Sequence, residues 1–255
     1  DTGIEDEAPV TYWVMGENNW RTADDWPVPD TQWTKFYLQS WERLSTEVAE
    51  PASAVEYQAP DAFVQMPPTQ TNTIEKLRYL TGPLADDLLV AGPMVMNLFA
   101  AIDQTDTNWI VIIKDVGPHE SVQTAREGEY SVPDDLPERE VTRGWLKASH
   151  RAIDEKRSEL WKPWHPLTRE AQKPVTPGDI EEYAIEILAT GNMFKRGHRI
   201  CVEITSLDLS TGVAGATNVE YIPYHICSSK TTLHKIYHDR ERPSHLLVPA
   251  VPLDG

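Results

Sequence analysis

The chain has 255 residues, of which 40% are hydrophobic and 25% are charged, so it can bury a core of its own and is not disordered as a whole. Its formal net charge is −17, from 40 Asp and Glu against 23 Lys and Arg. A field of this sign repels phosphate backbones, so we expect no nucleic acid partner, and no basic run suggests a membrane surface.

Short apolar segments separated by turn residues follow one another along the chain, which is typical of strands. In chain order the expected strands are 10–15, 35–38, 76–81, 94–102, 109–116, 143–151, 180–188, 198–205, 231–238 and 244–251. No segment has a long helical period, although 158–172 allows a turn or two of helix. The sequence therefore predicts an all-β fold, a β-sandwich or barrel, in a single domain over 1–255.

The first expected strand carries an unusual share of tryptophan. Five of the nine tryptophans lie in the first 41 residues, and Trp favours sites with one apolar side and one polar tip. Because Trp13 and Met15 alternate with residues that are equally apolar, this strand needs cover on both faces. We predict a docking surface for a second domain, with five candidate residues: Trp13, Met15, Trp20, Trp26 and Trp33.

A second strand has a simpler pattern. Between 199 and 205, Ile200, Val202 and Ile204 alternate with more polar residues, which predicts a sheet with one face in water. Cys201 on this strand and Cys227 are the two cysteines of the chain. We expect two free thiols, and a single bridge between them stays open as the alternative.

The sequence contains no complete catalytic set. No serine lies in a G-x-S-x-G turn, and no glycine-rich phosphate loop occurs. Ser149–His150 and Ser244–His245 are adjacent pairs, but neighbours on a strand point to opposite faces and cannot share a proton. We therefore expect no catalytic residue and no cofactor in this chain.

Two segments could hold a metal ion. His234 and His238 have the spacing of one helix face, but Lys235 stands where the zinc hydrolase motif needs Glu. The acidic run 103–108 could hold calcium, yet a turn built on Asp and Asn side chains explains it equally well. We expect no metal site, and leave calcium at 103–108 open.

Several segments in order resemble the C-terminal domain of the X-Pro dipeptidyl-peptidase and cocaine esterase group of serine hydrolases. They are VMGENNWRTADDWPVPDTQWTKFYL (14–38), the stretch from LRYLTGPLADD to WIVIIKDV (77–116), TRGWLKASHRAID (142–154), EEYAIEILATGNMFKRGHRICVEI (181–204) and RPSHLLVPAVP (242–252). The resemblance covers nearly the whole chain, and it includes an F..GHR turn that ends in His198 and Arg199.

The resemblance implies a galactose-binding-like jelly roll attached to an α/β-hydrolase domain that carries Ser, Asp and His, so no catalytic residue transfers to this chain. Residues 1–8 resemble the connector from that domain. The expected role is to stabilise the hydrolase domain of the same parent chain, to shape its active-site entrance through 61–71, with Phe63 and Met66 as rim candidates, and to form a homo-oligomer contact.

Two other functions stay open. The first is an independent carbohydrate-binding module, in which Trp33 and Trp41 would form a coplanar platform for a sugar ring. The second is a metal-dependent enzyme that uses His234, His238 and a further carboxylate.

Overall fold

The computed structural model describes residues 3–4, 7–48, 60–67, 70–71, 73–118, 137–208 and 229–253. Within these ranges the chain consists of strands, turns and short 3-10 segments, so the all-β prediction is confirmed. No helix in the described part of the chain is long and apolar enough to span a bilayer.

Thirteen strands are described. Their bounds are β1 Val10–Val14, β2 Asn19–Ala23, β3 Gln32–Gln39, β4 Arg43–Ser45, β5 Asp61–Gln65, β6 Lys76–Leu80, β7 Leu88–Ile102, β8 Asn108–Val116, β9 Glu138–Lys147, β10 Glu181–Phe194, β11 Arg199–Thr205, β12 Thr232–Tyr237 and β13 His245–Val251. A 3-10 turn, Ala148–His150, follows β9.

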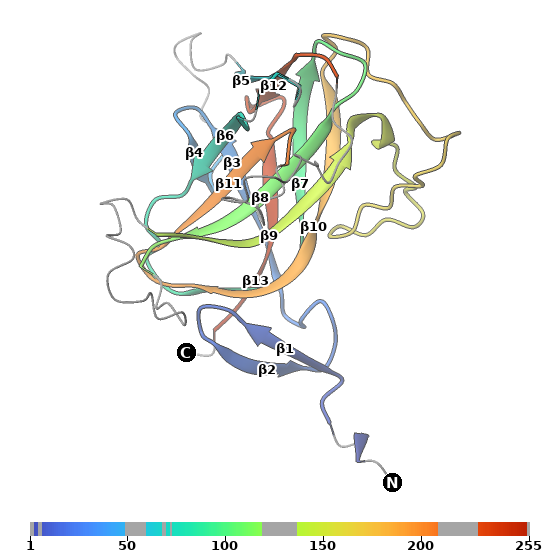
Figure 1. The fold of residues 1–255 in the computed structure, drawn as a ribbon. Coiled ribbons are helices and arrows are strands. Elements are labelled where there is room, and N and C mark those ends of the chain that lie inside the picture. The colour runs from blue at the N-terminus through green and yellow to red at the C-terminus, as the bar shows by residue number, and fades with distance from the viewer. Residues whose placement is uncertain are drawn as a thin grey trace, which may run out of the picture.

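Two sheets contain these strands. β1 and β2 form a separate hairpin, and the other strands form one sheet in the order β10-β9-β8-β11-β6-β4-β3-β13-β7-β12-β5. Because β10 also pairs with β7, the sheet closes on itself, and β12 and β5 continue beyond the closed part. The result is barrel-like, with the hairpin below it on the side of the N-terminus (Figure 1).

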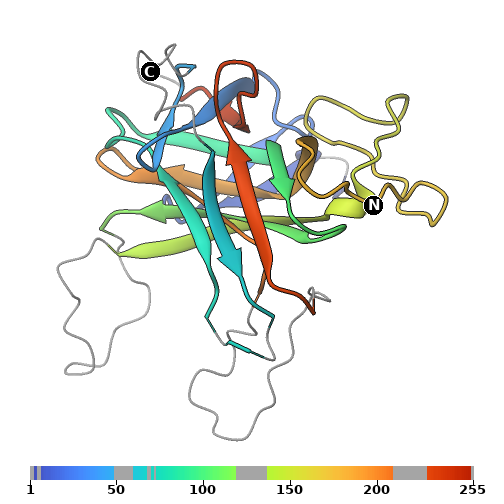
Figure 2. The same cartoon turned by 90° about the horizontal axis from the view of Figure 1, so that it is seen from above.

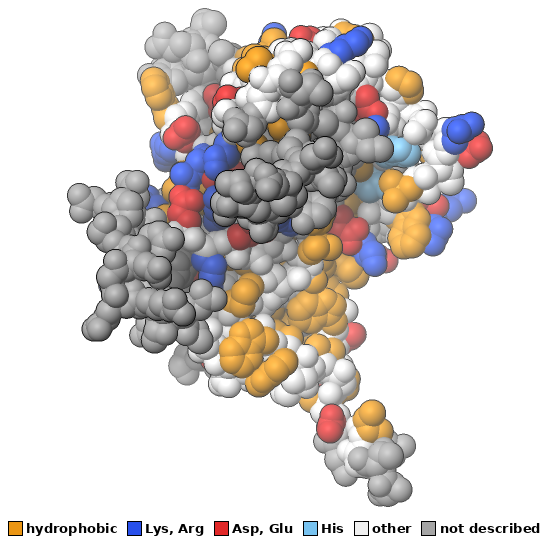
Figure 3. Space-filling model, in the orientation of Figure 1, with side chains coloured by type: hydrophobic (Ala, Val, Ile, Leu, Met, Phe, Trp, Pro, Cys, Tyr) orange, Lys and Arg blue, Asp and Glu red, His pale blue; other side chains and the backbone are white. Residues whose placement is uncertain are grey.

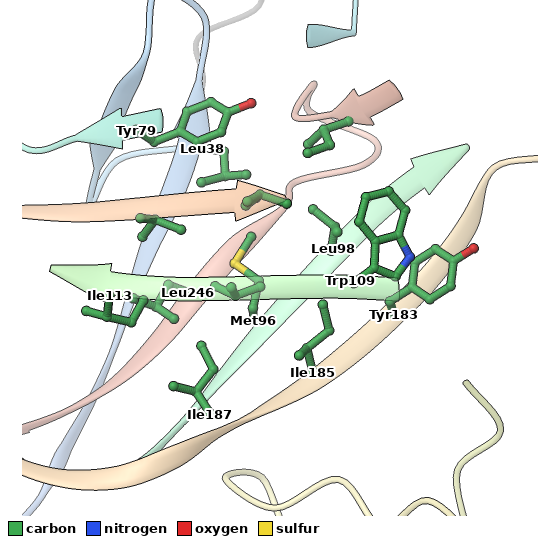
Figure 4. Packing of buried hydrophobic residues seen from close by; sticks show 14 of the residues in the cluster. Leu38, Tyr79, Met96, Leu98, Trp109, Ile113, Tyr183, Ile185, Ile187 and Leu246 are labelled. Carbon is green, nitrogen blue, oxygen red and sulfur yellow. The ribbon is translucent and has the colours of Figure 1, made fainter. Parts of the chain in front are cut away.

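The apolar core fills the space inside this closed sheet. Viewed from above, two groups of strands cross each other (Figure 2). Met96 of β7, Trp109 of β8 and Ile185 of β10 point into the space between them (Figure 4). Strands on opposite walls of the closed sheet therefore share one core.

All ten expected strands overlap an observed strand, but β2, β4 and β5 were not predicted. The helix allowed over 158–172 is wrong, because that stretch holds turns and an isolated bridge between Glu159 and Lys162. Pro163 and Pro166 explain this, since each lacks a backbone N–H and clashes with a preceding helical turn.

The prediction of a wet outer face on β11 is also wrong. Ile200, Val202 and Ile204 face the core as expected, but Cys201 and Glu203 on the other face are buried too. The Glu203 carboxylate accepts hydrogen bonds from Lys76 Nζ and Lys114 Nζ, both at 2.9 Å. Arg78 Nε lies 3.3 Å from the same oxygen.

This ion cluster explains the misprediction. The aliphatic stems of lysine and arginine side chains from neighbouring strands can cover the strand surface while their charged ends stay near water. Cys201 beneath them is a free thiol, with Arg78 Nη2 3.6 Å from its sulfur, and burial raises its pKa. Cys227 lies outside the described residues, so the expectation for that thiol stays a prediction.

Closure of the sheet depends on a glycine at the crossing of two strands. Gly144 of β9 is paired with Val111 of β8 and with Ile187 of β10. A Cβ atom at Gly144 would lie 2.1 Å from the carbonyl oxygen of Glu186, a distance that no backbone contact tolerates. Glycine therefore allows β10 to approach β9 closely enough to close the sheet.

We predict that Gly144→Ala lowers the free energy of unfolding by about 3 kcal/mol, since the new methyl group meets backbone rather than a flexible side chain. Urea denaturation followed by circular dichroism measures this change. Gly82→Ala is the matched control, because a Cβ there meets nothing within 4 Å. Equal stability of the two variants would contradict the closure described here.

Candidate docking surface

The β1–β2 hairpin is joined to the sheet at a single short junction. The backbone N–H of Met15 donates to the carbonyl of Gly191 at 3.0 Å, and Met193 N–H donates to the carbonyl of Met15 at 2.8 Å. A Cβ atom at Gly191 would lie 2.5 Å from the carbonyl oxygen of Trp13, so glycine is needed where the hairpin touches β10. This junction fixes the hairpin against the end of the barrel.

The inner face of the hairpin has its own small apolar cluster. Val14 is fully buried against Leu89 and Met193, and Tyr12 and Val251 pack on this cluster. The cluster is separate from the main core. One face of β1 is therefore covered by residues of this chain.

The outer face of the hairpin carries exposed aromatic rings. Trp13 and Trp20 are directly paired across β1 and β2, with ring centroids 5.4 Å apart and planes at 75°. Their exposed fractions are 42% and 61%. Hydrophobic side chains gather over the hairpin in the space-filling view (Figure 3). A cross-strand tryptophan pair that faces water is the apolar face that the sequence predicted for docking.

The three other docking candidates have different surroundings. Met15 lies at the junction described above, where it is half-buried. Trp26 packs edge-on against Tyr12 at 5.6 Å, so its ring supports the hairpin from the side. Trp33 is half-buried near the start of β3, where it pairs with Pro249.

A shallow cleft runs beside the hairpin. Its volume is about 550 Å³, and its lining includes Tyr12, Trp20, Pro29 and Val251. Arg21 also lines it, and its guanidinium holds the Glu17 carboxylate at 2.8 and 3.2 Å. The cleft thus combines apolar side chains with a larger polar part that includes this ion pair, a mixture that is common at the edge of protein interfaces.

The two rim candidates differ in exposure. Phe63 is 7% exposed and stacks on the His234 ring at 4.4 Å with nearly parallel planes, so it belongs to the core. Met66, just beyond β5, is 43% exposed. Between them, Gln65 is buried and its side chain bonds the backbone of Met66, Thr73 and Glu75.

The residues weighed as metal ligands have other partners. His234 Nε2 lies 2.8 Å from Thr107 Oγ1, whereas His238 Nε2 lies 3.0 Å from Asp61 Oδ2. In the acidic run, Asp103 accepts from the Leu233 N–H, and Asp106 accepts from backbone and side chain of Ser149. No group of three or more His, Cys, Asp or Glu in the described ranges is placed to hold a metal ion.

The adjacent Ser–His pairs do not form catalytic pairs either. Ser149 Oγ donates to Asp106 Oδ2 at 2.9 Å, while His150 Nε2 lies 3.1 Å from the Gln172 amide. Ser244 Oγ donates to the Tyr237 carbonyl, and His245 Nδ1 lies near the Pro243 carbonyl. Hydroxyl and imidazole therefore serve local structure in both pairs.

Sequence reasoning missed a buried polar pair that two quoted motifs bring together. Asp115 belongs to the IVIIKDV segment, and His198 belongs to the F..GHR turn. The distance between Asp115 Oδ1 and His198 Nδ1 is 2.8 Å. Both side chains are buried at the barrel end next to the hairpin. The signal was present in the two motifs, but nothing in the sequence indicated that residues 83 positions apart would meet.

Taken together, this geometry defines a barrel-like β domain with an exposed aromatic face on a small hairpin. Residues 2–247 match the family described as the X-Pro dipeptidyl-peptidase C-terminal non-catalytic domain. The chain therefore belongs to this family, and the resemblance drawn from the sequence is confirmed.

Curated relatives agree with this assignment. A Mycobacterium bovis protein named, provisionally, as a serine esterase is 27% identical over 82% of this chain and 34% of its own length. The cocaine esterase of a Rhodococcus species is 26% identical over 95% of this chain and 42% of its length. The chain thus spans about a third to two fifths of the curated relatives that it matches.

Solved structures show the same fold. A CocE/NonD family hydrolase from Staphylococcus aureus aligns with a TM-score of 0.68 and 20% identity, over 97% of this chain and 42% of that chain. An α-amino acid ester hydrolase aligns with a TM-score of 0.66 and 21% identity, over 96% and 41%. The fold of this chain is therefore that of one portion of each of these hydrolases.

The His234 ring beneath Phe63 makes stability depend on pH. Burial lowers the pKa of His234 from 6.5 to about 4. As the pH falls below about 6.5, His234 takes up a proton in the unfolded chain, whereas the buried His234 of the folded chain stays neutral. We predict that the free energy of unfolding decreases between pH 6.5 and pH 4 by up to about 3 kcal/mol through this residue, and then levels off.

Urea denaturation of wild-type protein and of His234→Gln at several pH values tests this. The variant should lose this part of the pH dependence, so the two stability curves converge as the pH falls. Parallel curves from pH 7 to pH 4 would show that His234 is not held neutral.

Proposed function

We propose that this domain docks on the catalytic α/β-hydrolase domain of its parent chain, and that the outer face of the β1–β2 hairpin forms the contact. The observation that carries the proposal is the exposed Trp13–Trp20 pair on a hairpin whose other face is already buried. Trp is enriched at protein interfaces, where it buries a large area and keeps one N–H to satisfy.

The comparisons support a same-chain partner. The matching family is named for a C-terminal non-catalytic domain, and the relatives are more than twice as long as this chain. We propose that the parent protein is a serine hydrolase that cleaves esters or N-terminal dipeptides, and that residues 1–8 connect the two domains. Homo-oligomer contacts through other faces of this domain stay a prediction.

We further propose that the domain helps to shape the active-site entrance. Of the two rim candidates, Met66 has the exposed side chain that such a contact requires, and Phe63 would act beneath it by fixing β5. The closed sheet described above would, in this proposal, be a variant of the galactose-binding-like jelly roll, formed as one domain over residues 1–255.

The carbohydrate-binding alternative gains no support from the aromatic residues proposed for it. Trp33 lies near the start of β3 and Trp41 lies in the turn beyond its end, so about six residues of extended chain, about 20 Å, lie between them. The exposed pair that does exist, Trp13 and Trp20, is edge-to-face rather than coplanar. A flat platform for a sugar ring is therefore not formed by either pair.

We predict that Trp13→Ala combined with Trp20→Ala weakens domain docking in the complete gene product that carries this chain. Buried interface tryptophans commonly contribute about 2 kcal/mol or more each. The expected result is faster protease cleavage within residues 1–8 and a lower temperature of inactivation of hydrolase activity. Both assays report on docking rather than on folding of this domain alone.

Trp41→Ala is the matched control, because Trp41 is 77% exposed and lies at the β3–β4 turn. It should leave both readouts unchanged. If the double variant behaves like this control while remaining folded, the hairpin face is not the docking surface.

A further inference from the structure

The interior of the barrel turns polar at the end next to the hairpin. Along β8, the core residues Trp109, Val111 and Ile113 are followed on the same face by Asp115, since side chains two positions apart share a face. Arg139 of β9 is in register with Asp115. The apolar core therefore ends in a pair of opposite charges.

Two further polar side chains join this pair. Arg139 Nη2 donates to Asn192 Oδ1 of β10 at 2.8 Å and lies 3.5 Å from Asp115 Oδ2. His198 contacts the other oxygen of Asp115. Asp115, Asn192 and His198 are 1%, 0% and 5% exposed. Four side chains from three strands and one turn thus form a polar group at the barrel mouth, in which Arg139 is partly exposed and the other three are buried.

A cleft opens onto this group beneath the hairpin turn. Its volume is about 450 Å³, and it is lined by residues 16–18 of the turn together with Asp115, Arg139, Lys195 and His198. Pockets of this size accommodate small molecules, and the mouth of a β-barrel is a common place for them. The lining is predominantly polar, unlike the apolar hairpin face above it.

Among the described residues, most of the hydrogen-bonding capacity left in this site consists of donors. Both contacts of Arg139 with described residues use Nη2, and its buried Nε has no acceptor among them. Within the described part of the chain, Asn192 Nδ2 is likewise a buried donor without an acceptor. Lys195 Nζ has one carboxylate partner, Asp87, at 3.1 Å. Both Glu17 oxygens already accept from Arg21, and Asp115 Oδ1 faces His198. Asp115 Oδ2 is a buried acceptor that accepts no hydrogen bond from a described residue, and its ion-pair contact is Arg139 Nη2 at 3.5 Å.

We propose that this barrel mouth binds a small carboxylate. The carboxylate oxygens would accept hydrogen bonds from Arg139 and Lys195. A small rotation of the Asn192 side-chain amide would supply Nδ2 as a further donor. A carboxylate matches the planar fork of a guanidinium, and such charge-assisted hydrogen bonds are stronger than neutral ones. An acceptor here would also remove the cost of leaving buried donors unsatisfied. The site is separate from the Trp13–Trp20 face, so it does not depend on docking.

Isothermal titration of the 255-residue chain with acetate, succinate and citrate at constant ionic strength tests the proposal, with acetamide as the uncharged control. At least one carboxylate should bind saturably, with a Kd of about 1 mM or below, and acetamide should not bind. Arg139→Gln and Lys195→Gln should each weaken that binding, the first by about tenfold or more.

Arg143→Gln is the matched control, because Arg143 lies on the same strand and pairs with Glu140 on the surface. It should bind like the wild type. Lys195→Gln keeps the test decisive if Arg139→Gln fails to fold, because Lys195 forms only a partly exposed ion pair. Absence of saturable binding, or equal binding by Lys195→Gln and Arg143→Gln, would overturn the proposal.

Discussion

The pairing of β10 with two strands at once is the constraint on which the rest of the structure depends. Its register with β7 runs from Glu181 to Phe194, with one irregularity after Ile187, and at Ile187 it also meets Gly144 of β9. This double pairing turns an open sheet into a closed one and encloses the core. The end of the same strand then holds the hairpin through Gly191 and Met193.

The closure of the sheet also limits which surfaces are left for the proposed contact with another domain. A closed sheet has few free edges through which another chain could pair, so side chains on attached elements are favoured for the proposed contact with a partner. The hairpin meets this requirement, since it is apolar on both faces and buries one of them on β10 and its neighbours. The polar barrel mouth beneath it is chemically distinct, so one small hairpin borders both an apolar face and a donor-rich cleft.

Periodicity predicted most of this fold, and the exceptions have physical causes. Long buried strands such as β7 and β8 are continuous apolar runs, so they were recognisable. β2 reads NWRTA and β4 has three residues, so neither contains a clear alternation. The closure of the sheet was not predictable, because it depends on the pairing of β10 with β7 and on a single glycine contact between Gly144 and Glu186.

In the candidate site, too, local features could be predicted from the sequence and contacts between distant segments could not. Tryptophan content and a two-faced apolar strand pointed to the exposed aromatic face of the hairpin, because both are local features of the sequence. That this face docks stays a prediction. The buried group around Asp115 and His198 escaped prediction, since its members come from four segments that only the folded sheet brings together. Glu203 was taken for a surface residue for a similar reason, as its three cationic neighbours lie on other strands.

Hydrogen–deuterium exchange followed by mass spectrometry tests the central claim most directly. The comparison is between the 255-residue chain and the complete gene product that carries it, with β9 peptides (138–147) as the internal reference. The account predicts slower exchange in peptides that cover residues 10–23 in the complete product, and unchanged exchange in β9. Equal exchange of residues 10–23 in both proteins would show that the hairpin faces water in the complete gene product and would contradict docking through Trp13 and Trp20.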